Sequence, residues 1–295
     1  MKSTVLISLT SIPRRFDGAL LEILAGLKRQ RLECEIVLNI PQQYRKWGAV
    51  ESIPPSLARM KGVTVFSPTK DYGPGTKLLG GLEYIKDRPE ITHIITVDDD
   101  IIIKDDLHLQ YLAAHARVLP DFAITFGGIR LERFPFGYGN GLSYNHTYKF
   151  VDGVHGFRGA LYPARRLLES RLPFTLFESL PAGVFFDDDA YFGILLSMLN
   201  IPLFAIPMRL PGGAGVKVSQ LEGGSAVQEL VEKERTLNEM EIFQFAYNAG
   251  YFSFAMANRK RQLTLNQQFR LAAIRSRSRL DINYFKAFYH KLRRS

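Results

Sequence analysis

Short apolar runs and helical apolar spacings alternate along the first two thirds of the chain. Between residues 17 and 28, the apolar positions Leu20, Ile23, Leu24 and Leu27 recur at helical intervals. The runs contain many β-branched residues and few polar ones, which is typical of strands covered on both faces. The predicted strands span residues 5–9, 36–40, 63–66, 91–97, 122–126 and 203–206. This alternation predicts an α/β fold with a mixed, mainly parallel sheet flanked by helices.

Further helices are predicted between and after these strands. One follows Pro74, one spans about 105–119, and one begins near Asp188. The glycine-rich segment 211–225 predicts a mobile loop, and 226–246 predicts a long helix. These changes of pattern predict a core domain over 1–210, a loop and helix over 211–258, and a tail over 259–295.

Positive charge is concentrated at one end of the chain. The net charge is +9, but the tail 259–295 alone carries +10, which leaves −1 for the other residues. Five aromatic residues accompany this charge, so the tail predicts contact with an anionic membrane surface. A structural helix or a dimer contact is the alternative.

The cellular compartment is predicted from cysteine content and hydropathy. The single cysteine, Cys34, lies in an apolar run, forms no intramolecular disulfide and fits a reducing compartment. No apolar run is long enough to cross a bilayer. We therefore expect a cytoplasmic protein that lies peripherally on the membrane.

The strongest chemical pattern is the run Asp98-Asp99-Asp100, which directly follows the predicted strand 91–97. In open parallel sheets, ligands bind beyond the carboxyl ends of the strands. Carboxylate oxygens suit Mg²⁺ or Mn²⁺, which in turn bridge phosphates. A solvated acidic turn or a helix cap is the alternative, but the position after a buried strand favours a metal site.

The pattern Asp98-x-Asp100 after an apolar strand resembles the DxD motif of GT-A glycosyltransferases, including family 2-like enzymes. The resemblance covers about residues 3–210. It implies a GT-A (Rossmann-like) fold with a helical C-terminal extension, in which 1–110 binds the nucleotide sugar and 111–210 the acceptor. It also implies that Asp98 and Asp100 bind Mn²⁺ or Mg²⁺, and that Asp98 and Asp99 contact the donor.

A second acidic run, Asp187-Asp188-Asp189, begins a predicted helix. One aspartate is enough to cap a helix, so three in a row suggest another role. The segment from Asp188 to Gly193 resembles the Glu-Asp-Val-Tyr-Val-Gly motif of β1,3-galactosyltransferase-like enzymes. That resemblance implies a general base, either Asp189 or Asp188.

Four further segments supply candidate donor contacts. The segment 156–162 resembles the glycine-rich strand of the same enzymes, the loop 11–15 matches the GT-A position that holds the nucleotide base, and 71–77 is a Gly/Pro turn before a helix. The glycine-rich loop offers a lysine that could reach a phosphate when the loop closes. A tightly packed strand and a helix start with an exposed lysine are the alternatives for 156–162 and 71–77. The donor-binding residues predicted in this way are Ser11, Pro13, Arg14, Asp71, Lys77, Arg158, Gly159 and Lys217.

The resemblance implies metal-dependent transfer of a sugar from a nucleotide diphosphate sugar to a hydroxyl group. A UDP-sugar is the favoured donor, and a glycan or lipid-linked glycan is the expected acceptor. A carboxylate base predicts inversion at the anomeric carbon, whereas retention stays open because sequence does not show which face the base occupies.

Two other functions remain as alternatives. A sugar nucleotidyltransferase needs a glycine-rich loop after the first strand, and residues 11–16 contain no glycine. A non-enzymatic adaptor that binds membrane or nucleic acid through the basic tail leaves both acidic runs unexplained. We expect no nucleic-acid partner, because the acidic runs would repel its phosphates.

Overall fold

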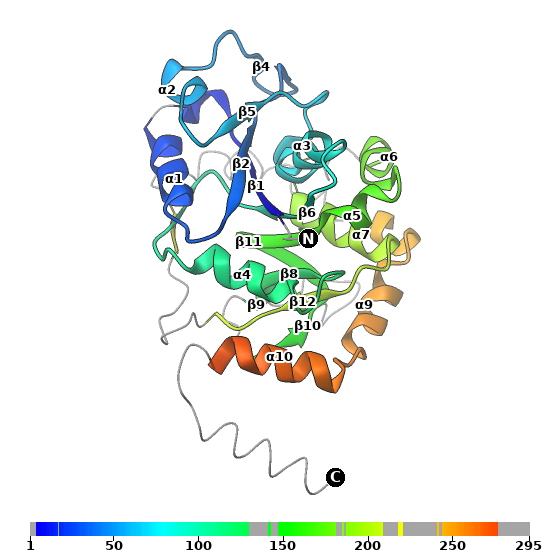
Figure 1. Ribbon diagram of the computed structural model, residues 1–295. Helices are drawn as coiled ribbons and strands as arrows, with labels where there is room; N and C mark the ends of the chain where they lie inside the picture. The colour runs from blue at the N-terminus through cyan, green and yellow to red at the C-terminus, as the bar shows by residue number, and fades with distance from the viewer. Residues whose placement is uncertain are drawn as a thin grey trace, which may run out of the picture.

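The computed structural model (Figure 1) describes residues 4–16, 18–129, 141–142, 147–180, 185, 187–208, 218–220, 241 and 244–276. Its main sheet contains β1 (Thr4–Thr10), β2 (Cys34–Asn39), β5 (Thr64–Phe66), β6 (Ile91–Thr96), β8 (Ala123–Ile129), β9 (Gly141–Leu142), β10 (Lys149–Phe150), β11 (Gly153–Pro163) and β12 (Leu203–Ala205). The strand order is β10-β12-β8-β11-β6-β1-β2-β5, and β9 pairs with β8. All six predicted strands are confirmed as members of this sheet.

Most neighbouring strands in the central part of the sheet point the same way. β1 is parallel to β2 and β6, β2 is parallel to β5, and β8 is parallel to β12. β11 lies antiparallel between β6 and β8, so β8 points the same way as β6. The carboxyl ends of β1, β2, β5, β6, β8 and β12 therefore lie at one edge. The mixed, mainly parallel α/β fold predicted from the sequence is confirmed.

Helices cover both faces of the sheet (Figure 1). They are α1 (Ala19–Lys28), α2 (Pro55–Ala58), α3 (Thr76–Ile85), α4 (His108–Ala116), α5 (Ala164–Leu168), α6 (Leu172–Glu178), α7 (Asp188–Met198), α9 (Tyr251–Arg259) and α10 (Leu265–Ser276). Alternate residues of β1 show why its run is apolar throughout: Ile7 and Leu9 pack with α1 and α4, whereas Leu6 packs with α3 and α7. Each face of the strand is thus buried under its own helical layer.

The segment predicted as a mobile loop over 211–225 contains a strand. β13 (Val218–Gln220) pairs antiparallel with β7 (Ile101–Ile103), which directly follows the first acidic run. The prediction of a loop was wrong for these three residues, because they form a strand by pairing with β7, and a glycine-rich composition does not reveal that distant partner. The rest of 211–225, and most of the helix predicted over 226–246, lies outside the described residues.

The beginning of the predicted tail belongs to the fold. Its first residue, Arg259, pairs with the fully buried Asp152. Just before the tail, the Asn258 side chain donates to the carbonyls of Val151 and Leu203 at 2.7 and 3.0 Å. α10 packs against α4. Residues 277–295 lie outside the described residues. None of the helices in the described ranges has the length and apolar character needed to span a membrane.

Candidate active site

The first acidic run lies where the order of the strands reverses. The chain places β2 and β5 on one side of β1 and then returns to place β6 on the other side. Asp98-Asp99-Asp100 follows the carboxyl end of β6 and precedes β7. Ligands of open α/β sheets bind at such a switch point, because the loops diverge there and leave a crevice.

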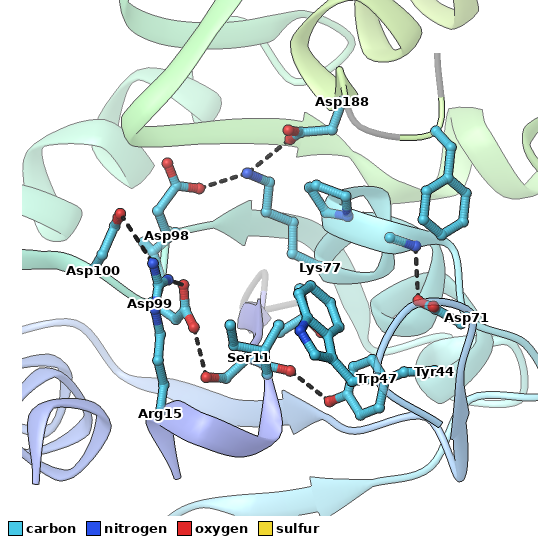
Figure 2. Close-up of a pocket in the computed structure, with 16 residues that line it drawn as sticks. Ser11, Arg15, Tyr44, Trp47, Asp71, Lys77, Asp98, Asp99, Asp100 and Asp188 are labelled. Atoms are coloured by element: carbon cyan, nitrogen blue, oxygen red, sulfur yellow. Dashed lines mark hydrogen bonds and ion pairs between the residues drawn. The ribbon is translucent and has the colours of Figure 1, made fainter. Parts of the chain in front are cut away.

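A cavity of about 320 Å³ opens at this switch point (Figure 2). Its walls come from the loop after β1, the segment 44–47, the turn 71–77, the first acidic run and the start of α7. Five aspartates and two basic residues line it, a formal net charge of −3. A crevice with this charge attracts cations and repels a bare phosphate. The lining residues are Thr10, Ser11, Ile12, Arg15, Tyr44, Trp47, Asp71, Gly73, Pro74, Lys77, Val97, Asp98, Asp99, Asp100, Phe185 and Asp188.

The middle aspartate of the first run is held by the loop after β1. The Ser11 hydroxyl donates to one oxygen of Asp99 at 2.5 Å, and the Arg15 guanidinium donates to the other at 2.5 Å. Arg15 also lies 3.8 Å from Asp100. Burial raises the pKa of Asp99, and the positive charge of Arg15 opposes that shift. Asp99 therefore joins the first acidic run to the loop after β1.

Lys77 connects the two acidic runs. Its side chain rises from the first turn of α3 and is buried, with 6% of the residue exposed. The ammonium nitrogen lies 2.5 Å from Asp98 Oδ1 and 2.7 Å from Asp188 Oδ2 (Figure 2). Burial disfavours the charge, but the two carboxylates raise the pKa of Lys77 well above its usual range. The lysine is therefore a buried cation shared by β6 and α7.

A rigid turn before α3 forms another wall. Both oxygens of Asp71 accept backbone N–H groups, from Gly73 and from Arg45, each at 2.8 Å. Gly73 has φ +56, and a Cβ there would lie 2.6 Å from the carbonyl oxygen of Phe185. Only glycine permits this close approach of the two segments. Asp71 thus shapes the wall as a turn residue.

The three aspartates of the second run point to three different partners. Asp187 caps α7, accepting from the backbone N–H of Ala190 at 3.0 Å. Asp188 pairs with Lys77 and lines the cavity. Asp189 accepts from the backbone N–H of Gly156 on β11, at 3.1 and 3.3 Å from its two oxygens. Helix capping therefore uses one member of the run, Asp188 lines the cavity, and Asp189 contacts β11.

Asp188 and Asp189 differ in basicity because their neighbours differ. Burial raises the pKa of Asp188, and the adjacent Lys77 ammonium opposes this. Burial, and then repulsion from Asp188, raise the pKa of Asp189 well above its usual range. Asp189 is therefore the stronger proton acceptor of the two when it is ionised.

An aromatic wall faces the first acidic run across the cavity (Figure 2). Tyr44 and Trp47 come from a hairpin of β3 (Gln43–Tyr44) and β4 (Gly48–Ala49), with their rings edge to face at 5.8 Å. The Tyr44 hydroxyl donates to the Ser11 carbonyl at 2.5 Å. Neither residue was predicted from the sequence. The available signal was a pair of aromatic residues among polar ones, directly after the second strand.

Several predicted donor residues lie away from this cavity. Arg15, and not Pro13 or Arg14, contributes the side chain from the short helix 13–15 to the wall. Arg158 is buried on β11, with its guanidinium 4.2 Å from the centre of the Phe157 ring. Lys217 lies outside the described residues. Ser11, Asp71, Lys77 and the first acidic run line the cavity, and their contact with a donor stays a prediction.

β11 carries an irregularity where it passes the second acidic run. His155 pairs with Gly127 and Ala160 with Thr125, so β11 uses three more residues than β8 over this interval. Gly159 has φ +93 and packs against α4. Bulges of this kind reorient a strand next to an active site. The bulge places the Gly156 N–H against Asp189.

The donor atoms fit a hard divalent cation, although they form no complete cage. Within the described ranges, no group of three His, Cys, Asp or Glu side chains is arranged to hold a metal. Mg²⁺ commonly keeps several waters and binds through one or two carboxylates together with substrate phosphates. Asp98 and Asp100, on either side of Asp99, supply oxygens of that type, and both lie near basic side chains, Lys77 and Arg15.

Comparison with protein family models gives no match, and comparison with curated proteins gives none. Among solved structures, the chain is similar to CMP:2-keto-3-deoxy-manno-octonic acid synthetase complexed with CTP, with 10% identity, TM-score 0.45, and coverage of 80% of this chain and 99% of that chain. It is also similar to 4-diphosphocytidyl-2C-methyl-D-erythritol synthase, with 12% identity, TM-score 0.44, and coverage of 78% and 100%. Similarities this weak carry no argument about activity. The sheet itself defines the class, a Rossmann-like α/β protein with an acidic crevice at its switch point.

Proposed function

We propose that this chain is a glycosyltransferase that moves a sugar from a nucleotide diphosphate sugar to a hydroxyl group. One observation carries the proposal. The switch-point cavity combines an acidic run, a buried lysine and an aromatic wall, and the second acidic run adjoins it. These are the groups needed to bind a base, a diphosphate with its cation, and a proton.

The donor is proposed to lie along the cavity with its base at the aromatic wall. Tyr44 and Trp47 offer ring faces and edges for a nucleobase. The diphosphate then lies between Lys77 and the first acidic run, where an Mn²⁺ or Mg²⁺ ion on Asp98 and Asp100 would neutralise its charge and help it to leave. A UDP-sugar remains the favoured donor, as predicted from the sequence.

Asp189 is proposed as the general base. The acceptor oxygen attacks the anomeric carbon while the bond to the diphosphate breaks, and the hydroxyl proton passes to a carboxylate oxygen of Asp189. Burial and repulsion from Asp188 raise the pKa of Asp189, which makes its ionised carboxylate the stronger proton acceptor. Asp188 is less suited to this role because its charge is engaged by Lys77. A base that acts opposite the leaving group gives inversion. The acceptor is proposed to be a glycan or a lipid-linked glycan.

Nucleotidyl transfer, the enzymatic alternative that the sequence left open, is the second candidate. The loop after β1 favours glycosyl transfer instead. Pro13 has no N–H, and the N–H groups of Arg15 and Phe16 are bonded within the loop, to Ile12 and Pro13. Few backbone donors therefore remain to grip a triphosphate at that loop.

The test incubates the protein with nucleotide sugars and Mn²⁺, and separately with nucleoside triphosphates and sugar 1-phosphates. We expect nucleoside diphosphate release from the first set, UDP-sugars included, and its loss with excess chelator or in Asp100→Asn. Pyrophosphate release from the second set alone would establish nucleotidyl transfer. Undiminished turnover in excess chelator would refute the proposed dependence on a divalent metal ion.

A further inference from the structure

The Lys77 ammonium is held by carboxylates from two segments that lie far apart in the sequence. Asp98 follows β6, and Asp188 begins α7 ninety residues later, yet one ammonium contacts both carboxylates (Figure 2). The Ser8 hydroxyl also donates to the Lys77 carbonyl at 2.5 Å, which fixes the first turn of α3 on β1. The base of the side chain is therefore held rigidly, and its charged end lies between the two runs.

We propose that Lys77 is a donor-binding residue whose contact with Asp98 is exchangeable. Before the donor binds, its ammonium serves as the counter-ion of Asp98 and Asp188. When a nucleoside diphosphate enters with its divalent cation, Asp98 would hold the cation in place of the ammonium. The ammonium then turns to a phosphate oxygen and keeps its contact with Asp188. The inference rests on the proposed function only in requiring a nucleoside diphosphate with a cation as ligand.

The charges around the cavity make this exchange favourable. Its lining has a formal net charge of −3 with Lys77 present, and −4 without it. A divalent cation entering alone meets the ammonium beside one of its carboxylates, which weakens its binding. A diphosphate entering alone meets five aspartates. When the two enter together, the cation offsets the carboxylates while the ammonium gains an anionic partner.

Lys77→Gln should change the affinities for Mn²⁺ alone and for UDP in opposite directions. Lys77→Gln removes the competing charge, so Mn²⁺ alone should bind at least about tenfold more tightly than to wild type. The same variant loses a charged hydrogen bond to phosphate, so UDP in saturating Mn²⁺ should bind at least about tenfold more weakly. A purely structural role for Lys77 would weaken both.

Two further variants guard against a folding defect. Lys77→Arg keeps the charge, so Mn²⁺ alone should bind within a few-fold of wild type. The double variant Lys77→Gln/Asp188→Asn removes both members of the buried pair and restores the net charge of −3, so its Mn²⁺ affinity should return toward wild type. Lys70→Gln is the matched control, because Lys70 makes an exposed ion pair with Glu178 and should change neither affinity.

The experiment measures free Mn²⁺ by electron paramagnetic resonance during titration, and UDP binding in Mn²⁺ by calorimetry. Circular dichroism verifies the fold of each variant. Unchanged or weaker binding of Mn²⁺ alone to Lys77→Gln would overturn the proposal, and so would unchanged UDP affinity. Either result could coexist with normal sugar transfer by wild type. Conversely, Lys77→Gln could bind Mn²⁺ more tightly and UDP more weakly while wild type transfers no sugar. That result would support the exchange at Lys77 and refute the proposed reaction.

Discussion

Gly156→Ala tests whether β11 positions the proposed base. The Gly156 N–H is hydrogen-bonded to the Asp189 carboxylate, and Gly156 lies in the bulge of β11. An added Cβ would lie 3.0 Å from Asp189 Oδ1, whereas its next neighbour, Val154 Cγ1, lies 3.9 Å away. The new methyl group therefore meets the carboxylate first.

The size of the effect follows from that contact. Ordinary contacts of a Cβ begin near 3.4 Å, so the carboxylate of Asp189 must shift by a few tenths of an ångström. Misplacement by about 1 Å costs about 10²-fold in rate, so we expect kcat to fall roughly 3- to 30-fold. UDP affinity should stay unchanged, because Asp189 is not part of the cavity lining.

The assay compares initial rates of nucleoside diphosphate release at saturating donor with calorimetric binding of UDP. Gly26→Ala is the matched control, because its Cβ would make only ordinary contacts, 3.5 Å to Arg29 and 3.7 Å to the Ile103 carbonyl. In an Asp189→Asn background, Gly156→Ala should have no further effect, since the two substitutions act on one group. The reasoning fails if kcat is unchanged, or if the same fold loss recurs in Asp189→Asn.

Three other predictions concern the base, the buried histidines and the tail. Asp189→Asn should lower kcat by roughly 10²- to 10⁴-fold with UDP affinity intact, whereas Asp188→Asn should mainly change donor affinity, and steady-state kinetics with calorimetry separates the two. Burial lowers the pKa of His108 and of His115 to about 4, so the unfolded chain binds more protons below its own pKa of about 6.5. The free energy of unfolding should therefore be highest above about pH 6.5 and fall by about 2 kcal/mol per histidine by pH 5. In His115→Gln, urea unfolding should show a decrease about half as large as in wild type, because only His108 still contributes. Removal of 277–295, which carries a net charge of +5, should abolish salt-sensitive co-sedimentation with anionic vesicles; unchanged co-sedimentation would exclude that segment as the membrane contact.

The central strands could be predicted because each corresponds to a continuous apolar run in the sequence. Six apolar runs became six strands of the main sheet, since a run covered on both faces needs nearly every residue to be apolar. The position of Asp98-Asp99-Asp100 at the ligand-binding edge also followed, because an acidic run directly after a buried parallel strand lies at its carboxyl end. The loop predicted at 218–220 failed because the strand there depends on β7, more than a hundred residues earlier.

The contacts within the site could not be predicted from the sequence. Arg15 reaches Asp99 across 84 positions, and the Gly156 N–H reaches Asp189 across 33. Local sequence patterns do not show contacts between residues so far apart in the chain. Arg14 was therefore predicted as a donor contact in place of Arg15, and Tyr44 and Trp47 were not predicted as cavity residues.

The sequence by itself determined which residue types were present, which strands they followed and which sheet edge they reached. Only the tertiary structure decided how the second acidic run is divided. Asp187 caps α7, Asp188 pairs with Lys77, and Asp189 bonds to Gly156. The reason is physical: adjacent side chains at a helix start leave in different directions. The cap by Asp187 is local to α7, whereas the partners of Asp188 and Asp189 come from α3 and β11, which only folding brings close to α7.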